Sequence, residues 1–285
     1  MRSPVPAAEW FRRHFTPDYS LLYSRRDREE ARREVAFIVD ALELSREDRV
    51  LDLCCGNGRH LEALREHGIV GVGVDLSPWL LEDARRRLEA ARRREAAEGR
   101  RALPPNPLVR ADMRALPFRG AVDAIEGATG GAVDREMKAD GFDAVLSLFT
   151  SFGYFDEHEE HARATSELAR VLRPGGSFLV DLFHPETTVR ELVPRTERRH
   201  GTLHIVEERH HDALRRRIEK SIHIEDRATG ETREYFESVY VFSLEEITDL
   251  LASVGLVVRS TWGDFHGRPF GGSSPRMILS GRRRG

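Results

Sequence analysis

The chain has 285 residues, of which 40% are hydrophobic and 33% are charged, with a formal net charge of −3. This length suffices for a large hydrophobic core, so we expect one elaborated domain or a domain with a cap. The charge balance argues against a general attraction to nucleic acid, and no apolar run is long enough to predict a membrane span.

The N-terminus carries Pro4, Pro6 and Glu9 and lacks the pattern of a signal peptide. The only two cysteines, Cys54 and Cys55, are adjacent and leave no disulfide framework. We therefore expect a cytoplasmic protein. The sequence leaves its oligomeric state open.

Residues 1–45 are predicted to form a helical segment. Aromatic residues gather between Trp10 and Tyr23, and an apolar stripe predicts a helix from about Asp27 to Leu44. The aromatic side chains either pack on the edge of a sheet or cover a bound ligand.

Residues 50–75 have the pattern of a βαβ nucleotide pocket. A buried strand leads into a turn with Gly56 and Gly58, a helix over 59–67 follows, and a second strand ends at Asp75. The glycines let the backbone approach a ligand closely, and a carboxylate at the end of the second strand can accept both hydroxyls of a ribose.

A dinucleotide is not the expected ligand of this pocket. The dinucleotide pattern G-x-G-x-x-G requires a third glycine where this chain has Leu61. Asp52 lies inside the first strand, where its carboxylate would repel a pyrophosphate and attract a cationic ligand.

The next helix is predicted to start at Ser77 and to run toward Gly99. Glu82 and Glu89 each precede an arginine by four residues, so we interpret the arginine-rich face as solvated and self-paired. Residues 119–140 carry glycines with little periodicity and predict a loop or short hairpin away from the substrate.

Four segments in order, over about residues 50–182, resemble the class I S-adenosylmethionine (SAM) methyltransferases. Besides the glycine turn, they are the third-strand end at 109–114, the apolar fourth strand at 142–149, and L-R-P-G-G at 172–176. Cys54 stands where the family has its first glycine, and it is small enough for a close-packed turn. The resemblance implies SAM as the cofactor and S-adenosylhomocysteine as its product.

The resemblance also implies a fold and a set of cofactor contacts. The fold is α/β, a Rossmann-like, doubly wound, seven-stranded sheet with a C-terminal antiparallel hairpin. Asp75 would bind the ribose, Asp112 and Met113 the adenine, and the turn at 54–58 would lie beneath the methionine part. The expected cofactor-binding residues are Tyr19, Tyr23, Asp52, Cys54, Cys55, Gly56, Asn57, Gly58, Asp75, Leu76, Asp112, Met113, Leu148 and Phe149.

The pattern changes after residue 182. Three β-rich runs with turn residues between them predict an antiparallel meander over 202–210, 214–226 and 233–242. A helix over 243–254 and two final strands follow. In the resembled family such an inserted three-stranded meander covers the substrate. We therefore assign 1–45 to an N-terminal helical lid segment, 46–200 and 243–285 to the SAM-binding domain, and 201–242 to a substrate lid.

The segment after the fourth strand lacks the [DN]-P-P-[YF] motif of enzymes that methylate bases or glutamine amides. It reads S-L-F-T-S-F from Ser147, which predicts an apolar pocket wall and resembles methyltransferases of small metabolites, including sugar-nucleotide N-methyltransferases. The expected substrate contacts are Phe152, Tyr154, His266 and Arg268, and the candidate base is His184. Arg276 either holds an anionic substrate group or lies in a surface strand.

No metal site is expected, because H-E-E-H at 158–161 lacks the spacing of H-E-x-x-H. We predict a SAM-dependent methyltransferase that acts on an O or N atom of a small molecule. Two alternatives stay open. An RNA or tRNA methyltransferase would need a basic surface, against which the net charge argues. A non-catalytic SAM-binding regulator would share the same pocket.

Overall fold

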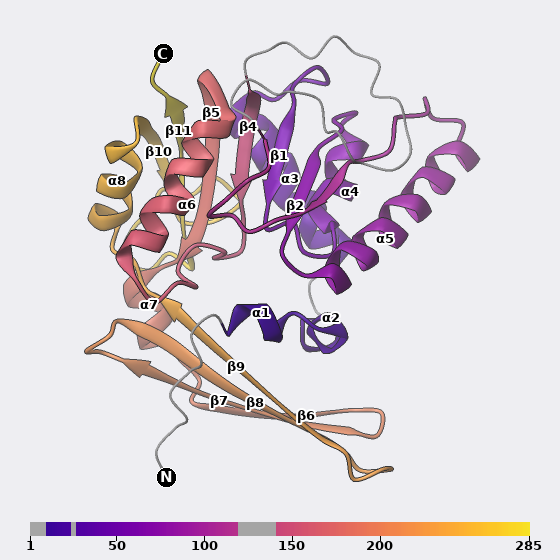
Figure 1. Ribbon diagram of the computed structural model, residues 1–285, viewed down its shortest axis with the longest axis vertical. Helices are drawn as coiled ribbons and strands as arrows, with labels where there is room; N and C mark the ends of the chain where they lie inside the picture. The colour runs from indigo at the N-terminus through magenta and orange to yellow at the C-terminus, as the bar shows by residue number, and fades with distance from the viewer. Residues whose placement is uncertain (1–9, 24–26, 119–140) are drawn as a thin grey trace.

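The computed structural model describes residues 10–23, 27–118 and 141–285. The insertion at 119–140 lies outside the described residues. In the described part, an α/β core and a separate antiparallel sheet lie on either side of two short helices (Figure 1). These helices are α1 (Phe11–His14) and α2 (Pro17–Leu22).

The core sheet has seven strands in the order β10-β11-β5-β4-β1-β2-β3. Pairs among β1 to β5 are parallel, whereas β11 pairs antiparallel with β5 and with β10. This arrangement confirms the predicted doubly wound sheet with a C-terminal hairpin. The strands are β1 (Val50–Leu53), β2 (Val72–Asp75), β3 (Leu108–Arg110), β4 (Phe142–Ser147), β5 (Leu172–Phe183), β10 (Leu256–Trp262) and β11 (Arg276–Arg283).

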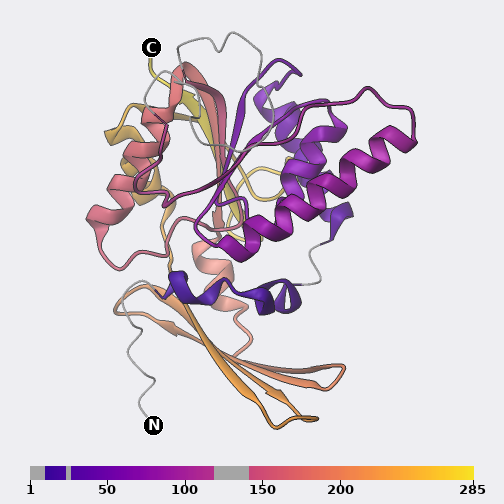
Figure 2. The same ribbon diagram turned by 45° about the vertical axis from the view of Figure 1, so that its right-hand side comes forward.

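Helices cover both faces of the core sheet (Figure 2). One buried apolar cluster includes Ile38 and Leu64 from α3 and α4, and another includes Leu168 and Leu251 from α6 and α8. None of the described helices combines the length and apolarity needed to cross a membrane. The helices are α3 (Arg28–Leu42), α4 (Arg59–Glu66), α5 (Pro78–Ala97), α6 (His158–Val171), α7 (Pro185–Arg190) and α8 (Leu244–Ser253).

Helix α5 begins where its sequence predicts. The Ser77 hydroxyl accepts from the N–H of Leu80 at 3.2 Å, which satisfies one of the free donors of the first turn. Glu82 and Glu89 each lie 3.7 Å from the arginine four residues on. These contacts confirm the predicted self-paired face.

The separate sheet, which we call the lid sheet, has four antiparallel strands in the order β6-β7-β8-β9. The three predicted strands correspond to the last three of these. β6 reads R-T-E-R-R-H, which has no apolar alternation to predict a strand, and it forms by pairing along β7. The lid sheet therefore begins at Arg195 and not at 201. The strands are β6 (Arg195–His200), β7 (Leu203–Asp212), β8 (Arg217–Asp226) and β9 (Thr232–Tyr240).

The lid sheet binds the two N-terminal helices directly. The Tyr235 hydroxyl donates to the Asp18 carboxylate at 2.6 Å, and Arg233 lies 3.0 Å from the same group. Arg198 donates to the carbonyl of Leu22 at 2.9 Å, and the Leu22 side chain packs on isoleucines of β7 and β8. Helices α1 and α2 are thus attached to the lid sheet by polar and apolar contacts.

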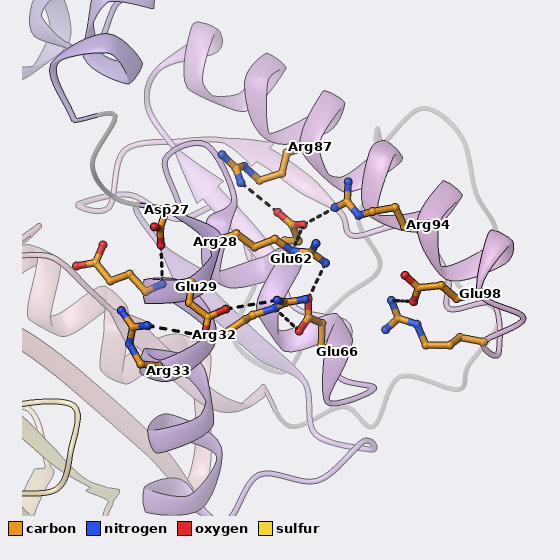
Figure 3. Close-up of polar contacts among 12 residues, drawn as sticks. Asp27, Arg28, Glu29, Arg32, Arg33, Glu62, Glu66, Arg87, Arg94 and Glu98 are labelled. Carbon is orange, nitrogen blue, oxygen red and sulfur yellow. Dashed lines mark hydrogen bonds and ion pairs between the residues drawn. The ribbon is translucent and has the colours of Figure 1, made fainter.

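A buried carboxylate joins helices α3, α4 and α5 (Figure 3). Glu62 of α4 is 2% exposed and lies 2.9 Å from Arg28 of α3 and 3.1 Å from Arg87 of α5. Arg94 of α5 is its third ionic partner. Because three cations surround one carboxylate, the cost of burying that charge is offset only while the cluster is complete.

We expect the substitution Glu62→Ala to lower the free energy of unfolding by about 3 kcal/mol, because it leaves three neighbouring arginines without their shared carboxylate. The matched control is Glu89→Ala on α5, whose exposed ion pair with Arg93 contributes at most about 0.5 kcal/mol. Urea unfolding of both variants measures the difference. Equal losses would contradict the role given to the cluster.

Candidate cofactor and acceptor site

A cavity of about 250 Å³ opens at the carboxyl ends of β1, β2 and β4. This is the edge at which a doubly wound sheet binds its ligands, because the strand order reverses there. The described lining residues are Phe11, Phe15, Tyr19, Tyr23, Cys54, Cys55, Gly56, Asn57, Arg59, His60, Asp75, Leu76, Leu80, Asp83, Arg87, Ala111, Asp112, Met113, Leu148, Phe149, Ser151, Tyr154 and Phe155.

The cavity brings together the predicted cofactor contacts except Asp52 and Gly58. Of the predicted substrate contacts, Tyr154 lines it. Phe11 and Phe15, from the aromatic segment that the sequence predicted to pack on the sheet edge or to cover a ligand, line it as well, and so does Arg59, which no motif indicated.

The turn after β1 has a left-handed backbone at three positions. The φ angle is +65° at Cys54, +55° at Gly56 and +72° at Gly58. A Cβ added at Gly58 would lie 3.0 Å from that of Ala84, so this glycine allows α5 to approach. A Cβ added at Gly56 would meet no protein atom within 4 Å. Since Gly56 lines the cavity, it leaves room for a ligand there.

Asp75, at the end of β2, connects this turn to the start of α5. Its carboxylate accepts from the N–H of Gly56 at 2.9 Å and from the N–H of Ser77 at 2.8 Å. Burial raises the pKa of Asp75, and these backbone donors oppose the rise. A carboxylate can accept about four hydrogen bonds, so Asp75 retains capacity for ligand hydroxyls.

Asp52 lies within β1, is 1% exposed and is not part of the cavity lining. Its Oδ2 atom has no hydrogen-bond partner among the described residues. Burial raises the pKa of Asp52 to about 7, with Arg59 opposing the rise and Asp75 adding to it. A cationic ligand close to this carboxyl would favour its ionised form.

Asp112 and Met113 line the cavity after β3. The Asp112 carboxylate accepts from Arg114 at 2.6 and 3.0 Å and from Arg12 at 3.3 Å. Burial would raise the pKa of Asp112, but the hydrogen bonds from Arg114 and the charge of Arg12 outweigh it and lower the pKa. Any ligand amino group that binds Asp112 therefore shares it with two arginines.

Aromatic side chains from α1, α2 and the residues that follow α1, α2 and β4 are part of the cavity lining. Neighbouring rings lie close together, with centroids 4.6 Å apart for Tyr19 and Tyr23 and 5.0 Å apart for Phe15 and Tyr19. We call this group the aromatic wall, and its members are Phe11, Phe15, Tyr19, Tyr23, Phe149 and Tyr154.

Two residues after β4 adopt a backbone conformation that is rare outside glycine. The φ angle is +64° at Phe149 and +57° at Thr150. The Asp181 carboxylate accepts a hydrogen bond from the backbone N–H of Phe149 at 2.8 Å. The backbone carbonyl of Asp181 accepts one from the backbone N–H of Thr150 at 2.9 Å. Arg276 donates to the Asp181 carboxylate at 2.6 and 2.7 Å. Arg276 thus supports this turn, a role the sequence did not predict.

The remaining predicted site residues lie elsewhere. His184 is 2% exposed and caps α7, where its Nδ1 accepts from the N–H of Thr187 at 3.1 Å; its ring stacks on Phe270. It does not line the described cavity, and its role as a base stays a prediction. Phe152 is fully buried in the core.

His266 and Arg268 lie between β10 and β11 and are also absent from the cavity lining. The Asp264 carboxylate accepts from the backbone N–H of His266 at 2.9 Å and pairs with the Arg268 guanidinium. These contacts organise the connection between the two strands. Substrate binding by either residue stays a prediction.

The strand order, the glycine turn after β1 and the acidic end of β2 define the fold of class I, Rossmann-like methyltransferases. A family model described as a methyltransferase domain matches residues 23–261. The chain therefore belongs to this methyltransferase family.

Two curated relatives match about half of the chain. One is dTDP-3-amino-3,4,6-trideoxy-alpha-D-glucopyranose N,N-dimethyltransferase of Streptomyces venezuelae, 32% identical over 139 residues, which are 48% of this chain and 44% of that protein. The other is glycine N-methyltransferase of Rattus norvegicus, 32% identical over 138 residues, which are 47% of this chain and 39% of that protein. The matched region spans less than half the length of either relative.

A solved structure resembles nearly the whole chain. SAM-bound CalS10, an amino pentose methyltransferase of Micromonospora echinaspora, is 21% identical with a TM-score of 0.61, over 94% of this chain and 97% of that one. The comparisons confirm the predicted fold and methyltransferase class, and SAM as the cofactor of that class.

Two glycine substitutions distinguish the loss of space for a ligand from the cost of backbone strain. Gly56→Ala and Gly99→Ala introduce a side chain at φ +55° and +66° with no protein atom within 4 Å. We expect each to lower stability by about 1 kcal/mol. Only Gly56→Ala should weaken SAM binding, by about tenfold, because its methyl group enters the cavity. Urea unfolding and titration calorimetry test this, and equal SAM affinity in the two variants would refute it.

Asp52 gives a pH-dependent prediction. Its folded pKa of about 7 lies above the ordinary 3.8, so between these values the folded state holds the extra proton and stability falls as pH rises. Asp52→Asn removes this contribution. The free energy of unfolding of Asp52→Asn, relative to that of the wild type, should therefore increase from about pH 4 to 7 and then level off.

Urea unfolding of the SAM-free protein from pH 5 to 8.5 measures this difference. The control is Asp249→Asn, which makes the same substitution at an exposed position of α8. If the free energy of unfolding of Asp52→Asn differed from that of the wild type by the same amount at every pH, Asp52 would be ionised over the whole range from pH 5 to 8.5.

Proposed function

We propose that this protein transfers a methyl group from SAM to the amino nitrogen of a small molecule. The observation that carries the proposal is one cavity lined by two chemically different sets of residues. One set is the glycine turn with Asp75, and the other is the aromatic wall. Both curated relatives are, by name, enzymes that methylate nitrogen, which favours N over O as the acceptor atom.

The proposed donor site uses the turn at 54–58 and the ends of β2 and β3. The space above Gly56 accommodates the methionine part, and Asp75 accepts from the ribose hydroxyls. Leu76 and Met113 contact the adenine ring, and Asp112 accepts from its amino group. When bound, SAM supplies a methyl group already activated by a positive sulfur. Asp52 lies in β1 just before this turn, its Oδ2 atom has no hydrogen-bond partner among the described residues, and a nearby cation would favour its ionised form.

The proposed acceptor site is the aromatic wall. Transfer to nitrogen is an in-line displacement, so these residues must align the acceptor with the methyl carbon and exclude water. Ring faces attract ammonium groups, and Tyr19, Tyr23 and Tyr154 combine such faces with a hydroxyl. The Asp181–Arg276 pair holds Phe149 in place. This wall suits a small amine better than an extended polymer.

The location that we propose is the cytoplasm. Both cysteines are free thiols, and Cys55 is buried beside the ligand turn. A reducing compartment preserves them in this form.

The test of the function is transfer of labelled methyl groups from SAM. We expect label in glycine or in dTDP-3-amino-3,4,6-trideoxy-α-D-glucopyranose, offered beside a metabolite extract, total tRNA and rRNA. Asp75→Ala should lose at least about tenfold in SAM affinity, because it removes charge-assisted hydrogen bonds. Label in RNA alone would support an RNA methyltransferase. SAM binding without transfer to any acceptor would support a regulator.

A further inference from the structure

A buried charged cluster lies where the lid sheet meets α1 and α2. Lys220 of β8 is 8% exposed, and its ammonium lies 3.3 Å from Glu207 of β7 and 3.3 Å from Glu237 of β9. His14 of α1 lies 2.8 Å from the Glu237 carboxylate. None of these residues lines the described cavity.

The lysine itself is informative, because the chain uses arginine almost everywhere else. Only Lys138 and Lys220 are lysines among 45 basic residues. A lysine carries a compact point charge with three donors, which suits a position between two carboxylates and a hydroxyl. The residue type therefore matches the geometry of this cluster.

Glu237 stays ionised despite its burial. Burial alone would raise the pKa of Glu237, but the charge of Lys220, the neighbouring His14 and the hydroxyl of Tyr23 outweigh it and hold the pKa well below its ordinary range. Such a carboxylate is a poor proton acceptor. It is a strong hydrogen-bond acceptor.

Tyr23 connects this cluster to the cavity. Its hydroxyl donates to the Glu237 carboxylate, and Lys220 donates to the Tyr23 oxygen at 2.8 Å. The Lys220 ammonium also lies 4.6 Å from the centre of the Tyr23 ring. Tyr23 belongs to the aromatic wall, next to Tyr19 and Phe149. The proton of its hydroxyl is thus directed toward the lid sheet.

We propose that Glu237 and Lys220 are positioning residues that act through Tyr23. They fix the Tyr23 oxygen as a hydrogen-bond acceptor for an N–H group of the amine, which orients the nitrogen lone pair toward the methyl carbon. This inference rests on the function proposed above and narrows its substrate class to primary and secondary amines. A neutral tertiary amine has no N–H to donate, so methylation stops at that product.

The alternative role is mere attachment of the lid sheet to the N-terminal helices. Asp18 provides the control, because it binds Tyr235 and Arg233 of the lid sheet and is not among the described residues that line the cavity. Asp18→Asn weakens attachment and leaves the Tyr23 contacts intact. If attachment were the whole role, this variant and Glu237→Gln would behave alike.

The first measurement is the ¹³Cζ resonance of Tyr23 in the full chain, assigned by its loss in Tyr23→Phe. We expect Glu237→Gln and Lys220→Met to shift this resonance and Asp18→Asn to leave it in place. This readout needs no acceptor. An unshifted resonance in folded Glu237→Gln would overturn the proposed geometry.

The second measurement is steady-state kinetics with glycine or the amino sugar nucleotide, whichever the wild type methylates faster. Tyr23→Phe and Glu237→Gln should each lower kcat by about tenfold or more with SAM affinity within about twofold. The double variant should be no slower than Tyr23→Phe, because both changes act through one hydroxyl. Mass spectrometry should find no quaternary ammonium product.

The positioning role would be refuted if the losses of kcat in Tyr23→Phe and Glu237→Gln added in the double variant, or if Asp18→Asn lost as much kcat as Glu237→Gln. Either result would leave the proposed function in place. A quaternary ammonium product would refute the assigned substrate class. If the wild type methylates no amine, both proposals fail together.

Discussion

The parallel pairing of β1 with β2 on one side and β4 on the other is the constraint on which the site depends. Parallel strands have their carboxyl ends at the same edge of the sheet. Where the strand order reverses, the connections from neighbouring strands lead to opposite faces of the sheet. Three loops distant in sequence therefore meet around one cavity. The antiparallel β11 adds Arg276 to this edge from the far end of the chain.

Two carboxylates at strand ends hold the loops that surround the cavity. Asp75 accepts from the backbone of Gly56, and Asp181 accepts from that of Phe149. Both loops contain left-handed residues that are not glycine, which costs free energy unless neighbouring structure fixes them. In each case a carboxylate from an adjacent strand provides that restraint, so the loop geometry is set by the sheet.

The lid sheet contacts the cavity lining through the N-terminal helices and through the segment after β4, where Arg217 of β8 donates to the carbonyls of Tyr154 and Phe155. In the described part of the chain no residue of β6 to β9 lines the cavity, and α1 and α2 lie between the two (Figure 1). The lid sheet nevertheless contributes buried charge to the back of the aromatic wall. The lid sheet therefore acts indirectly in the proposed site. The segment of α1 and α2 supplies side chains that line the cavity, and Lys220 and Glu237 orient one of them, Tyr23.

Much of the proposed donor site could be predicted from the sequence, because its residues are close together in the chain. Strand, glycine turn, helix and terminal acid are encoded within residues 50–75, and hydrophobic periodicity identifies the strands around them. Only the tertiary structure showed the contacts that support the aromatic wall, which is the proposed acceptor site. Asp181, Arg276 and Lys220 act through partners 32 to 197 residues away, and no local pattern reports such pairing. The sequence also could not show that His184, the candidate base after β5, caps a helix and stacks on Phe270; its role as a base stays a prediction.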